Sequence, residues 1–218
     1  MAVQVAVPGM RRINNRVDQC CYAADVGVDG LGTVDIPAPP AALATGILNA
    51  QSIAAAGTSV PVVGFNSSVL GRYGRNVTVV ASGAATSNVT VNGYDYLGQA
   101  VKESFTLNGS TPVIGKKMFA DIVNVSYGLT AATTINVGYG NVLGLPYKAL
   151  GTVLLSELTS GVTPTAGVLV PGVDTQTLTS GDPRGNYTPN LVPDGVRSYR
   201  LTTTFDRNNL HGNAHVIA

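Results

Sequence analysis

The sequence predicts an all-β protein: an antiparallel β-sandwich or jelly-roll-like module with an extended N-terminal arm and long loops rich in Pro and Gly. Valines alternate with Asn and Thr between residues 75 and 106, which is the period-two pattern of half-buried strands. Each apolar run is short and ends at Gly, Asn or Pro, and the runs recur about every dozen residues. Antiparallel neighbours of this kind can be joined by hairpins, without crossover helices.

Residues 1–59 lack this alternation and are predicted to form the arm. Asp and Gly punctuate residues 25–35, and the prolines of residues 36–40 fix φ in an extended segment. Residues 41–56 contain enough Ala and Leu for a short helix, but Thr45-Gly46 interrupts them, so we expect a weak helix or an irregular connection. Such an arm becomes ordered only where its apolar side chains lie on the body of the fold or on a neighbouring subunit.

Residues 60–218 are predicted to form the β-sandwich domain. Three antiparallel strands in a row are expected over residues 75–81, 88–99 and 100–109, where valine alternation is clearest. Further strands are expected at residues 60–63, 119–127 and 133–139.

The polar side chains of the first two central strands give a specific prediction about register. Asn76 with Thr78, and Asn88 with Thr90, alternate with the valines. Because successive strand residues point to opposite faces, these four side chains should lie on the outward or subunit-facing side of the sheet.

Residues 151–195 are predicted to be a Pro-rich excursion, since prolines at this frequency favour edge strands and surface loops over central strands. Asp182-Pro183-Arg184-Gly185 and Pro193-Asp194-Gly195 are turn signals within it. A closing strand is expected at residues 196–206, with one face made of Tyr199, Leu201, Thr203 and Phe205.

Charged residues make up only 11 % of the 218 residues and apolar residues 44 %, so the protein surface has few charged groups to interact with water. This fits either a membrane protein or a protein covered by partners. No apolar run approaches the roughly 20 residues of a spanning helix, so no membrane association is expected. The charges near the N-terminus follow the apolar residues, which does not predict an export leader.

With a net charge of only +1, the chain lacks the positive surface potential that attracts nucleic acid, so no nucleic-acid partner is expected. Arg11, Arg12 and Arg16 form a local basic trio, which favours ion pairs between the arm and a partner. The two cysteines, Cys20 and Cys21, are adjacent and cannot form a disulfide framework. They indicate reduced thiols and folding in a reducing cytosol.

The sequence predicts no catalytic, cofactor-binding or metal-binding site. It has neither a Gly-x-Ser-x-Gly elbow nor a phosphate loop. His211 and His215 are four residues apart, but Gly212 lies between them without a nearby Glu or Cys, so an exposed or interface-packed tail is expected. The aspartates within residues 25–35 lack the register of a calcium loop and fit turn-capping roles.

Four stretches of the chain stand out as a set. They are residues 74–79 (Gly-Arg-Asn-Val-Thr-Val), 93–99 (Gly-Tyr-Asp-Tyr-Leu-Gly-Gln), 105–119, and Asp182-Pro183-Arg184-Gly185-Asn186-Tyr187 through His211-Gly212. Together they resemble virion structural proteins of tailed bacteriophages, and more narrowly the capsid decoration, or cement, proteins. The likeness covers roughly residues 60 to 215.

This resemblance implies a non-enzymatic module on the outside of a phage head that bridges neighbouring major capsid protein subunits and stabilises the shell. It brings no catalytic residues with it. A homo-oligomer is expected, a trimer rather than a dimer, made in the host cytoplasm and located on the capsid exterior. The arm and the Pro-rich loops are the expected contact elements, with Arg11, Arg12, Arg16, Arg184 and Tyr187 as candidate contact residues.

Two other functions fit the sequence less well. A tail or fibre component that binds a carbohydrate receptor would need an exposed aromatic platform, for which Tyr94 and Tyr96 are a thin candidate pair. A hydrolase is the weakest alternative.

Overall fold

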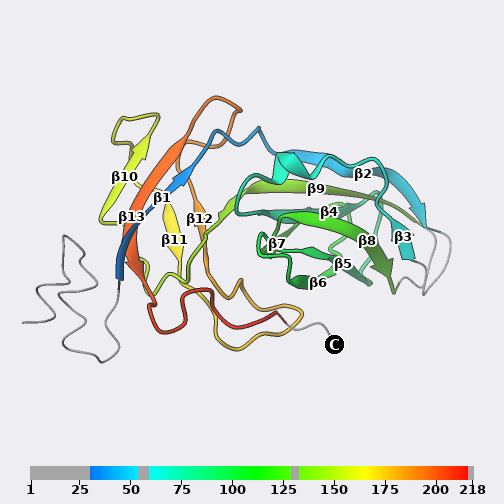
Figure 1. Cartoon of the computed structure of the whole chain (residues 1–218). Coiled ribbons are helices and arrows are strands. Elements are labelled where there is room, and N and C mark those ends of the chain that lie inside the picture. Colours follow the sequence, from blue (N-terminus) through cyan, green and yellow to red (C-terminus); the bar gives the residue numbers. More distant parts are fainter. Residues whose placement is uncertain (1–29, 54–58, 129–132, 216–218) are drawn as a thin grey trace, which may run out of the picture.

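The computed structural model describes residues 30–53, 59–128 and 133–215, and in these ranges the chain is built almost wholly from antiparallel strands (Figure 1). The predicted all-β sandwich is confirmed. In chain order the elements are β1 (Gly30–Ile36), β2 (Leu43–Ile53), β3 (Ser59–Pro61), the 3-10 turn η1 (Ser67–Leu70), β4 (Arg75–Ala81), β5 (Asn88–Tyr94), β6 (Ala100–Thr106), β7 (Val113–Phe119), β8 (Asp121–Tyr127), β9 (Thr133–Gly144), β10 (Ser156–Thr159), β11 (Val168–Val170), β12 (Asn186–Thr188) and β13 (Tyr199–Phe205).

The larger of two lobes contains β2 to β9 and is a sandwich curled into a half-barrel (Figure 1). One layer is the four-stranded sheet β3-β8-β5-β6, and the other is formed by β7, β4, β9 and β2. Their inner faces share a core because alternate strand residues point inward. Val77, Val89, Val91, Val125 and Val137 are fully buried in that core.

The smaller lobe has its own core and contains the sheet β1-β13-β10 together with β11, β12 and the end of β9 (Figure 1). Leu145, Leu169, Tyr187, Tyr199 and Leu201 are among its buried residues. Strand β9 belongs to both lobes, because residues 133–143 pair with β4 or β2 and Leu143 and Gly144 pair with β12.

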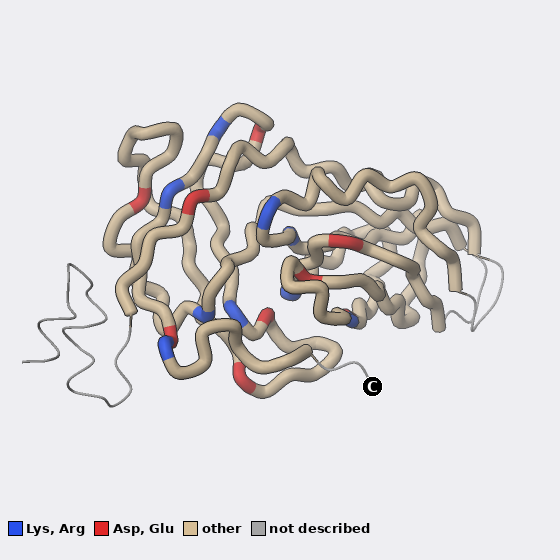
Figure 2. The backbone as a smooth tube through the Cα atoms, viewed as in Figure 1, with Lys and Arg blue, Asp and Glu red and all other residues tan. Residues whose placement is uncertain are grey.

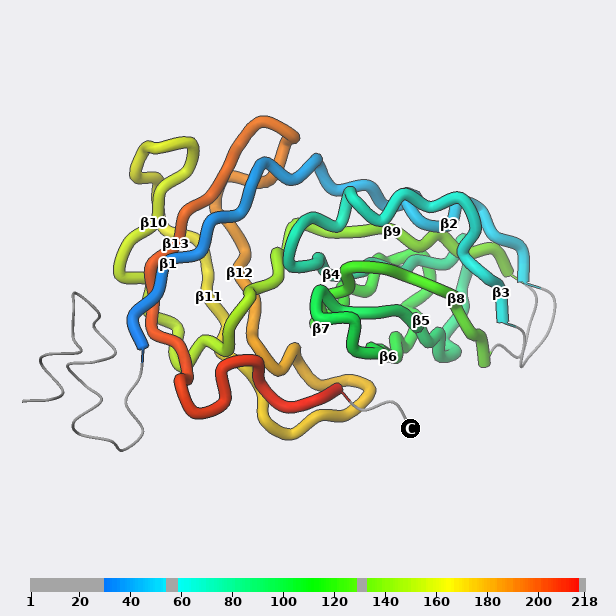
Figure 3. Tube along the Cα trace, viewed as in Figure 1, coloured from blue at the N-terminus to red at the C-terminus, as the bar shows by residue number. Residues whose placement is uncertain are grey.

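The path of the chain crosses between the lobes more than once (Figure 3). It leaves β1 through residues 37–42 to enter the larger lobe and returns to the smaller lobe at the end of β9. After β11 it runs back beneath the half-barrel, where Leu178 O accepts a hydrogen bond from Ser104 N of β6 (2.8 Å). The two lobes are therefore linked by several separate segments.

Two predicted features are confirmed, although the strands are shorter than expected. Strands β5 and β6 form a hairpin, pairing from Asn88 with Thr106 to Tyr94 with Ala100. The closing strand β13 lies between β1 and β10, and the predicted inner face is buried at all four positions, Tyr199, Leu201, Thr203 and Phe205.

The predicted extended arm needs correction over residues 30–53. These residues form β1, paired along its length with β13, and β2, paired with β9. The weak helix or irregular connection expected over residues 41–56 is therefore wrong where the structure describes it. Residues 1–29 lie outside the described part of the chain.

The prediction of three central strands in a row is also wrong, because β4 and β5 belong to different sheets. Alternation identifies a strand but does not say which layer the next strand joins. After β4 the chain crosses to the opposite layer, and β4 pairs with β7 and β9.

The outward position predicted for Asn76 is wrong as well, since its side chain is fully buried. Pairing of β4 with β9 is irregular between Arg75 and Val77, and the Asn76 side-chain oxygen accepts a hydrogen bond from Val142 N (3.0 Å) at that irregularity. The side-chain amide of Asn76 therefore supplies the hydrogen-bond acceptor that Val142 N lacks where the strand pairing is irregular. Asn88 and Thr90 do lie on the outer face of β5, opposite buried Val89 and Val91.

The excursion over residues 151–195 is mainly surface loop, as predicted. Strands β10 and β11 are edge strands of their sheets. Strand β12 differs from the prediction, because it lies inside its sheet between β11 and β9.

Candidate functional site

Charged residues are spread over the smaller lobe and the adjoining part of the half-barrel, whereas the described residues at the far end of the half-barrel include none (Figure 2). One group of contacting side chains at the junction of the two lobes consists of Asp95, Tyr96, Asp182, Arg184 and His215, of which all but Tyr96 are buried; we call it the junction cluster. It joins the β5–β6 turn, the loop before β12 and the C-terminal segment.

The turn at residues 182–185 places two members of the junction cluster. Asp182 Oδ1 accepts from Arg184 N (2.9 Å), and Asp182 Oδ2 accepts from Met118 N of β7 (3.0 Å). Gly185 has φ 82°, and a Cβ there would lie 2.2 Å from Val170 O. The Asp-Pro-Arg-Gly sequence therefore folds as a turn that is held against the edge of the larger lobe.

Arg184 and Asp95 form a fully buried ion pair with 2.8 Å between Nη1 and Oδ2. The other carboxylate oxygen of Asp95 accepts from Leu97 N (2.9 Å) and Gln99 N (2.8 Å), which fixes the β5–β6 turn. The Arg184 guanidinium also lies over the Tyr96 ring, 5.1 Å from its centroid. One side chain of the smaller lobe thus binds a turn of the larger lobe through two kinds of contact.

Electrostatics keep the Asp95 carboxylate ionised. Burial acts to raise its pKa, but the hydrogen bond from His215 and the charge of Arg184 outweigh burial, so the pKa is lowered. His215 Nε2 lies 3.5 Å from Arg184 Nη2 and 3.7 Å from Asp95 Oδ2. The buried Arg184–Asp95 pair therefore holds a loop of the smaller lobe against a turn of the larger lobe.

A second buried carboxylate, Glu103 on β6, bridges the two layers of the half-barrel. Its oxygens accept from Lys116 N (2.5 Å) and Lys117 N (3.2 Å) on β7, where no backbone pairing joins these strands. Gly115 makes room for it, because a Cβ there would lie 2.7 Å from Glu103 Oε2. Burial raises the pKa of Glu103 to about 7.

Arg75 is a second fully buried arginine at the junction. Its guanidinium donates to Pro40 O (2.8 Å) and to Gly140 O, and it lies over the Tyr139 ring. Burial lowers its pKa to about 10, so it stays charged at neutral pH. Arg75 holds the segment between β1 and β2 against β9.

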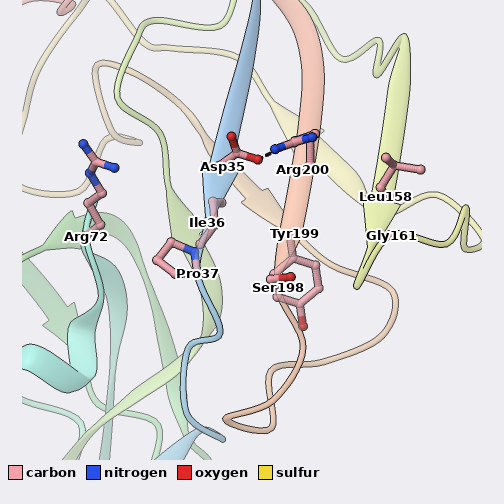
Figure 4. Close-up of a pocket in the computed structure, with 9 residues that line it drawn as sticks. All are labelled: Asp35, Ile36, Pro37, Arg72, Leu158, Gly161, Ser198, Tyr199 and Arg200. Atoms are coloured by element: carbon pink, nitrogen blue, oxygen red, sulfur yellow. Dashed lines mark hydrogen bonds and ion pairs between the residues drawn. The ribbon is translucent and has the colours of Figure 1, made fainter.

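An open pocket of about 420 Å³ lies beside β1 and β13, with Asp35 and Arg200 paired on one wall at 2.5 Å (Figure 4). Arg72 faces it from the larger lobe, and Ile36 and Tyr199 supply apolar surface. Asp35 and Arg200 already neutralise one another. The pocket therefore presents one further cation, Arg72, beside an apolar floor.

Exposed apolar side chains are concentrated on the Pro-rich excursion. Together with the two residues that flank the excursion, Leu150 and Val196, we call this set the excursion surface; its members within the excursion are Val153, Leu155, Val162, Val168, Val170, Leu191 and Val192. The whole set makes up more than half of the large apolar side chains that are exposed in the described part of the chain. Edge strands β10 and β11 carry or adjoin several of them, and exposed apolar groups at sheet edges are typical of protein–protein contact sites.

Val162 illustrates how the excursion presents these groups. Thr159 and Val162 exchange backbone hydrogen bonds of 2.8 and 3.0 Å across a tight turn. Ser160 and Gly161 occupy that turn with φ of 51° and 85°. The turn directs Val162 outward, where 69 % of its surface is exposed.

The candidate contact residues from the sequence fall in three different places. Arg184 and Tyr187 are buried within the chain, and contact of these two residues with a partner stays a prediction. Tyr187 donates to Glu157 Oε1 (2.6 Å) and packs edge-on against Tyr199. The arm residues, Arg11, Arg12 and Arg16, lie outside the described residues.

The two tyrosines considered as an aromatic platform are also separated. Tyr94 is exposed on the sheet face, whereas Tyr96 packs against Tyr73 and Arg184. His215 is buried in the junction cluster rather than in an exposed tail.

Sequence reasoning missed the junction cluster and Glu103. The turn signal at residues 182–185 located Arg184, but nothing local indicated that its partner is Asp95, far away in the sequence. A charged residue inside the alternating strand 100–106 was the available signal for Glu103, because buried positions rarely carry charge without a partner.

Within residues 30–53, 59–128 and 133–215, no group of three or more His, Cys, Asp or Glu side chains could hold a metal ion. No helix in the same ranges is long and apolar enough to cross a membrane. Comparison with known proteins finds no matching family model, no matching curated protein and no matching solved structure.

Proposed function

We propose that this chain is a non-enzymatic structural protein of a bacteriophage virion, which binds the outer surface of the head and bridges neighbouring major capsid protein subunits. The resemblance of residues 60 to 215 to capsid decoration proteins suggests this role. The exposed apolar side chains of the excursion surface are the main structural observation that supports the proposed role.

The excursion surface supports a docking role for a physical reason. Its apolar side chains are exposed in the single chain, so covering them with a partner would remove apolar surface from water, which is favourable. The low charge of the chain supports the same reading, because charged residues are depleted from the buried centre of protein interfaces.

Rigid coupling between the lobes supports a bridging role. A protein that stabilises a shell must resist relative movement of the subunits it contacts. The buried Arg184–Asp95 pair and the contacts of Arg75 tie the two lobes together. Repetition around a shell then multiplies modest contacts into a large total effect.

Binding to heads tests the proposal directly. Purified protein is mixed with expanded empty heads of the phage that encodes it, and co-sedimentation is measured. Wild-type protein should bind saturably, and Val162→Asp combined with Val168→Asp should abolish binding because each change buries a charge in the contact. Val63→Asp with Ile114→Asp, two exposed positions on the larger lobe, is the matched control and should bind like wild type.

Failure of wild-type protein to bind these heads would contradict the proposal. If both double variants bound equally well, the excursion surface would not be the site that contacts the head. A homo-oligomer, preferably a trimer, is part of the proposal, and native mass spectrometry of the free protein measures it.

A further inference from the structure

A groove of about 370 Å³ lies on the outer face of the sheet β3-β8-β5-β6 in the larger lobe. Its lining comes from all four strands of this sheet. The residues used below are Asn92, Gly93, Tyr94, Lys102, Val123 and Asn124.

An irregularity in strand pairing forms the hollow. Asn92 pairs with Asn124, but the next residue, Gly93, pairs with Ile122, so Val123 is an extra residue on β8. A β-bulge of this kind turns side chains out of the regular alternation, and Val123 is exposed beside Asn124. Gly93 is required at this point, because a Cβ would lie 2.0 Å from Asp121 O.

The two asparagines leave one donor and one acceptor for a ligand. Asn92 Nδ2 donates to Asn124 Oδ1 (2.8 Å), and the hydroxyl of Ser59 donates to the same oxygen (3.4 Å). Among the described residues, the Asn92 side-chain oxygen and the Asn124 side-chain nitrogen have no hydrogen-bond partner. An acceptor and a donor held side by side on rigid strands match a pair of neighbouring hydroxyl groups, each of which can donate and accept.

Tyr94 supplies an aromatic surface next to these amides. It follows Asn92 on the same face of β5, is 44 % exposed, and lies across from Ala100, whose small side chain leaves the ring uncovered. Lys102 lies across from Asn92 and places one cation at the border of the groove. An aromatic ring can pack against the C–H face of a sugar while polar groups at its rim bind the hydroxyls.

We propose that this groove binds a saccharide, with Tyr94 against the sugar ring and Asn92 and Asn124 bound to adjacent hydroxyl groups. Nucleic acid is a poorer match because one lysine cannot track a phosphate backbone. An extended peptide adding a strand is a poorer match because β5 is already paired on both sides by β6 and β8. The groove is shallow, so Kd should be on the order of 1 mM for a short oligosaccharide.

Chemical-shift titration of the isotopically labelled full chain tests the proposal. The probes are cellotetraose, maltotetraose, tetra-N-acetylchitotetraose and tetragalacturonate, with polyethylene glycol as a polymer lacking sugar rings. At least one saccharide should cause saturable shifts of Gly93 and of the side-chain amides of Asn92 and Asn124. Tyr94→Ala and Asn124→Ala should each weaken that binding about tenfold or more, which corresponds to about 1.4 kcal/mol.

Asn88→Ala is the matched control, because Asn88 lies on the same face of β5 but outside the groove. It should leave the titration unchanged, and the spectrum of each variant shows whether the fold is kept. Absence of saturable shifts with all four saccharides would overturn the proposal, as would shifts located elsewhere or unaffected by the groove variants. Binding to heads does not depend on this groove, so the two proposals fail separately.

Discussion

Arg184 makes several buried contacts where the two lobes meet. It pairs with Asp95 in a fully buried contact, lies over Tyr96 and contacts His215. Two carboxylates, Asp95 and Asp182, lie within 3.6 Å of its guanidinium. Removing the cation would leave both buried without compensation, which is the costly case for buried ion pairs.

We predict that Arg184→Ala lowers the free energy of unfolding by about 3–5 kcal/mol, measured by urea denaturation. Arg197→Ala is the matched control, because Arg197 pairs with Asp194 at the same 2.8 Å but on the surface. It should change stability far less, since solvent screens exposed pairs. Equal losses in the two variants would show that burial of the Arg184 pair contributes nothing.

Glu103 gives the protein a pH dependence with a definite sign. Burial raises its pKa from the ordinary 4.5 to about 7. Between these values the folded protein holds a proton that the unfolded chain has released, so the free energy of unfolding falls as pH rises from about 4.5 to 7. Asp95 and Asp206, whose pKa values are lowered, titrate below this window.

We predict that Glu103→Gln removes this slope. A shift of this size corresponds to at most about 3 kcal/mol across the window, and the variant keeps the size of the side chain without its titration. Urea denaturation of both proteins at pH 5 and pH 8 measures the difference. If wild type and variant lose the same stability between these pH values, Glu103 is not the titrating group.

At the level of elements, the packing of β2 on β9 depends on close backbone contact. Pairing is interrupted between Leu43 and Leu48, and Gly138 of β9 lies opposite the interruption. A Cβ on Gly138 would lie 2.1 Å from Leu43 O, which is backbone and cannot move aside as a side chain could. Only glycine lets the two strands approach this closely.

We predict that Gly138→Ala destabilises the protein by about 1–3 kcal/mol through overpacking, measured by thermal or urea unfolding. Gly151→Ala is its control, because a Cβ there meets nothing within 4 Å. That change should stay within about 0.5 kcal/mol. A neutral Gly138→Ala would mean that β2 does not pack on β9 as described.

These contacts also explain how much of the fold the sequence could reveal. The pairing of β5 with β6 was predictable, because Val89 and Val91 alternate with polar residues, although the strand expected to run to residue 99 ends at Tyr94. Strand β2 was not, since its Thr45-Gly46 interruption and small side chains carry no alternation. Residues 43–53 form a strand because they pair with β9, so contacts with a distant part of the chain determine this strand.

The same limit applied to the candidate site. Turn chemistry located the loop at residues 182–185, but the burial of Arg184 depends on Asp95, 89 residues away. The prolines did indicate a surface excursion, and its exposed valines form the excursion surface. Local sequence therefore predicted where the chain leaves the core, but not which charges the folded protein would bury.

At the scale of the whole molecule, the functions suggested for different surfaces are spatially separate. The excursion surface belongs to the smaller lobe, whereas the groove beside Tyr94 lies on the outer sheet of the larger lobe. The junction cluster and Arg75 hold the lobes together between them. The chain can therefore dock through one lobe while the outer sheet of the other stays accessible.

The most direct test of the central claim is the number of copies of this protein in an intact virion, measured by quantitative mass spectrometry against the major capsid protein. A head protein that bridges capsid subunits should be present in a fixed ratio to them, repeated over the whole shell. A handful of copies per particle would instead indicate a tail or fibre component and would contradict the proposed role on the head.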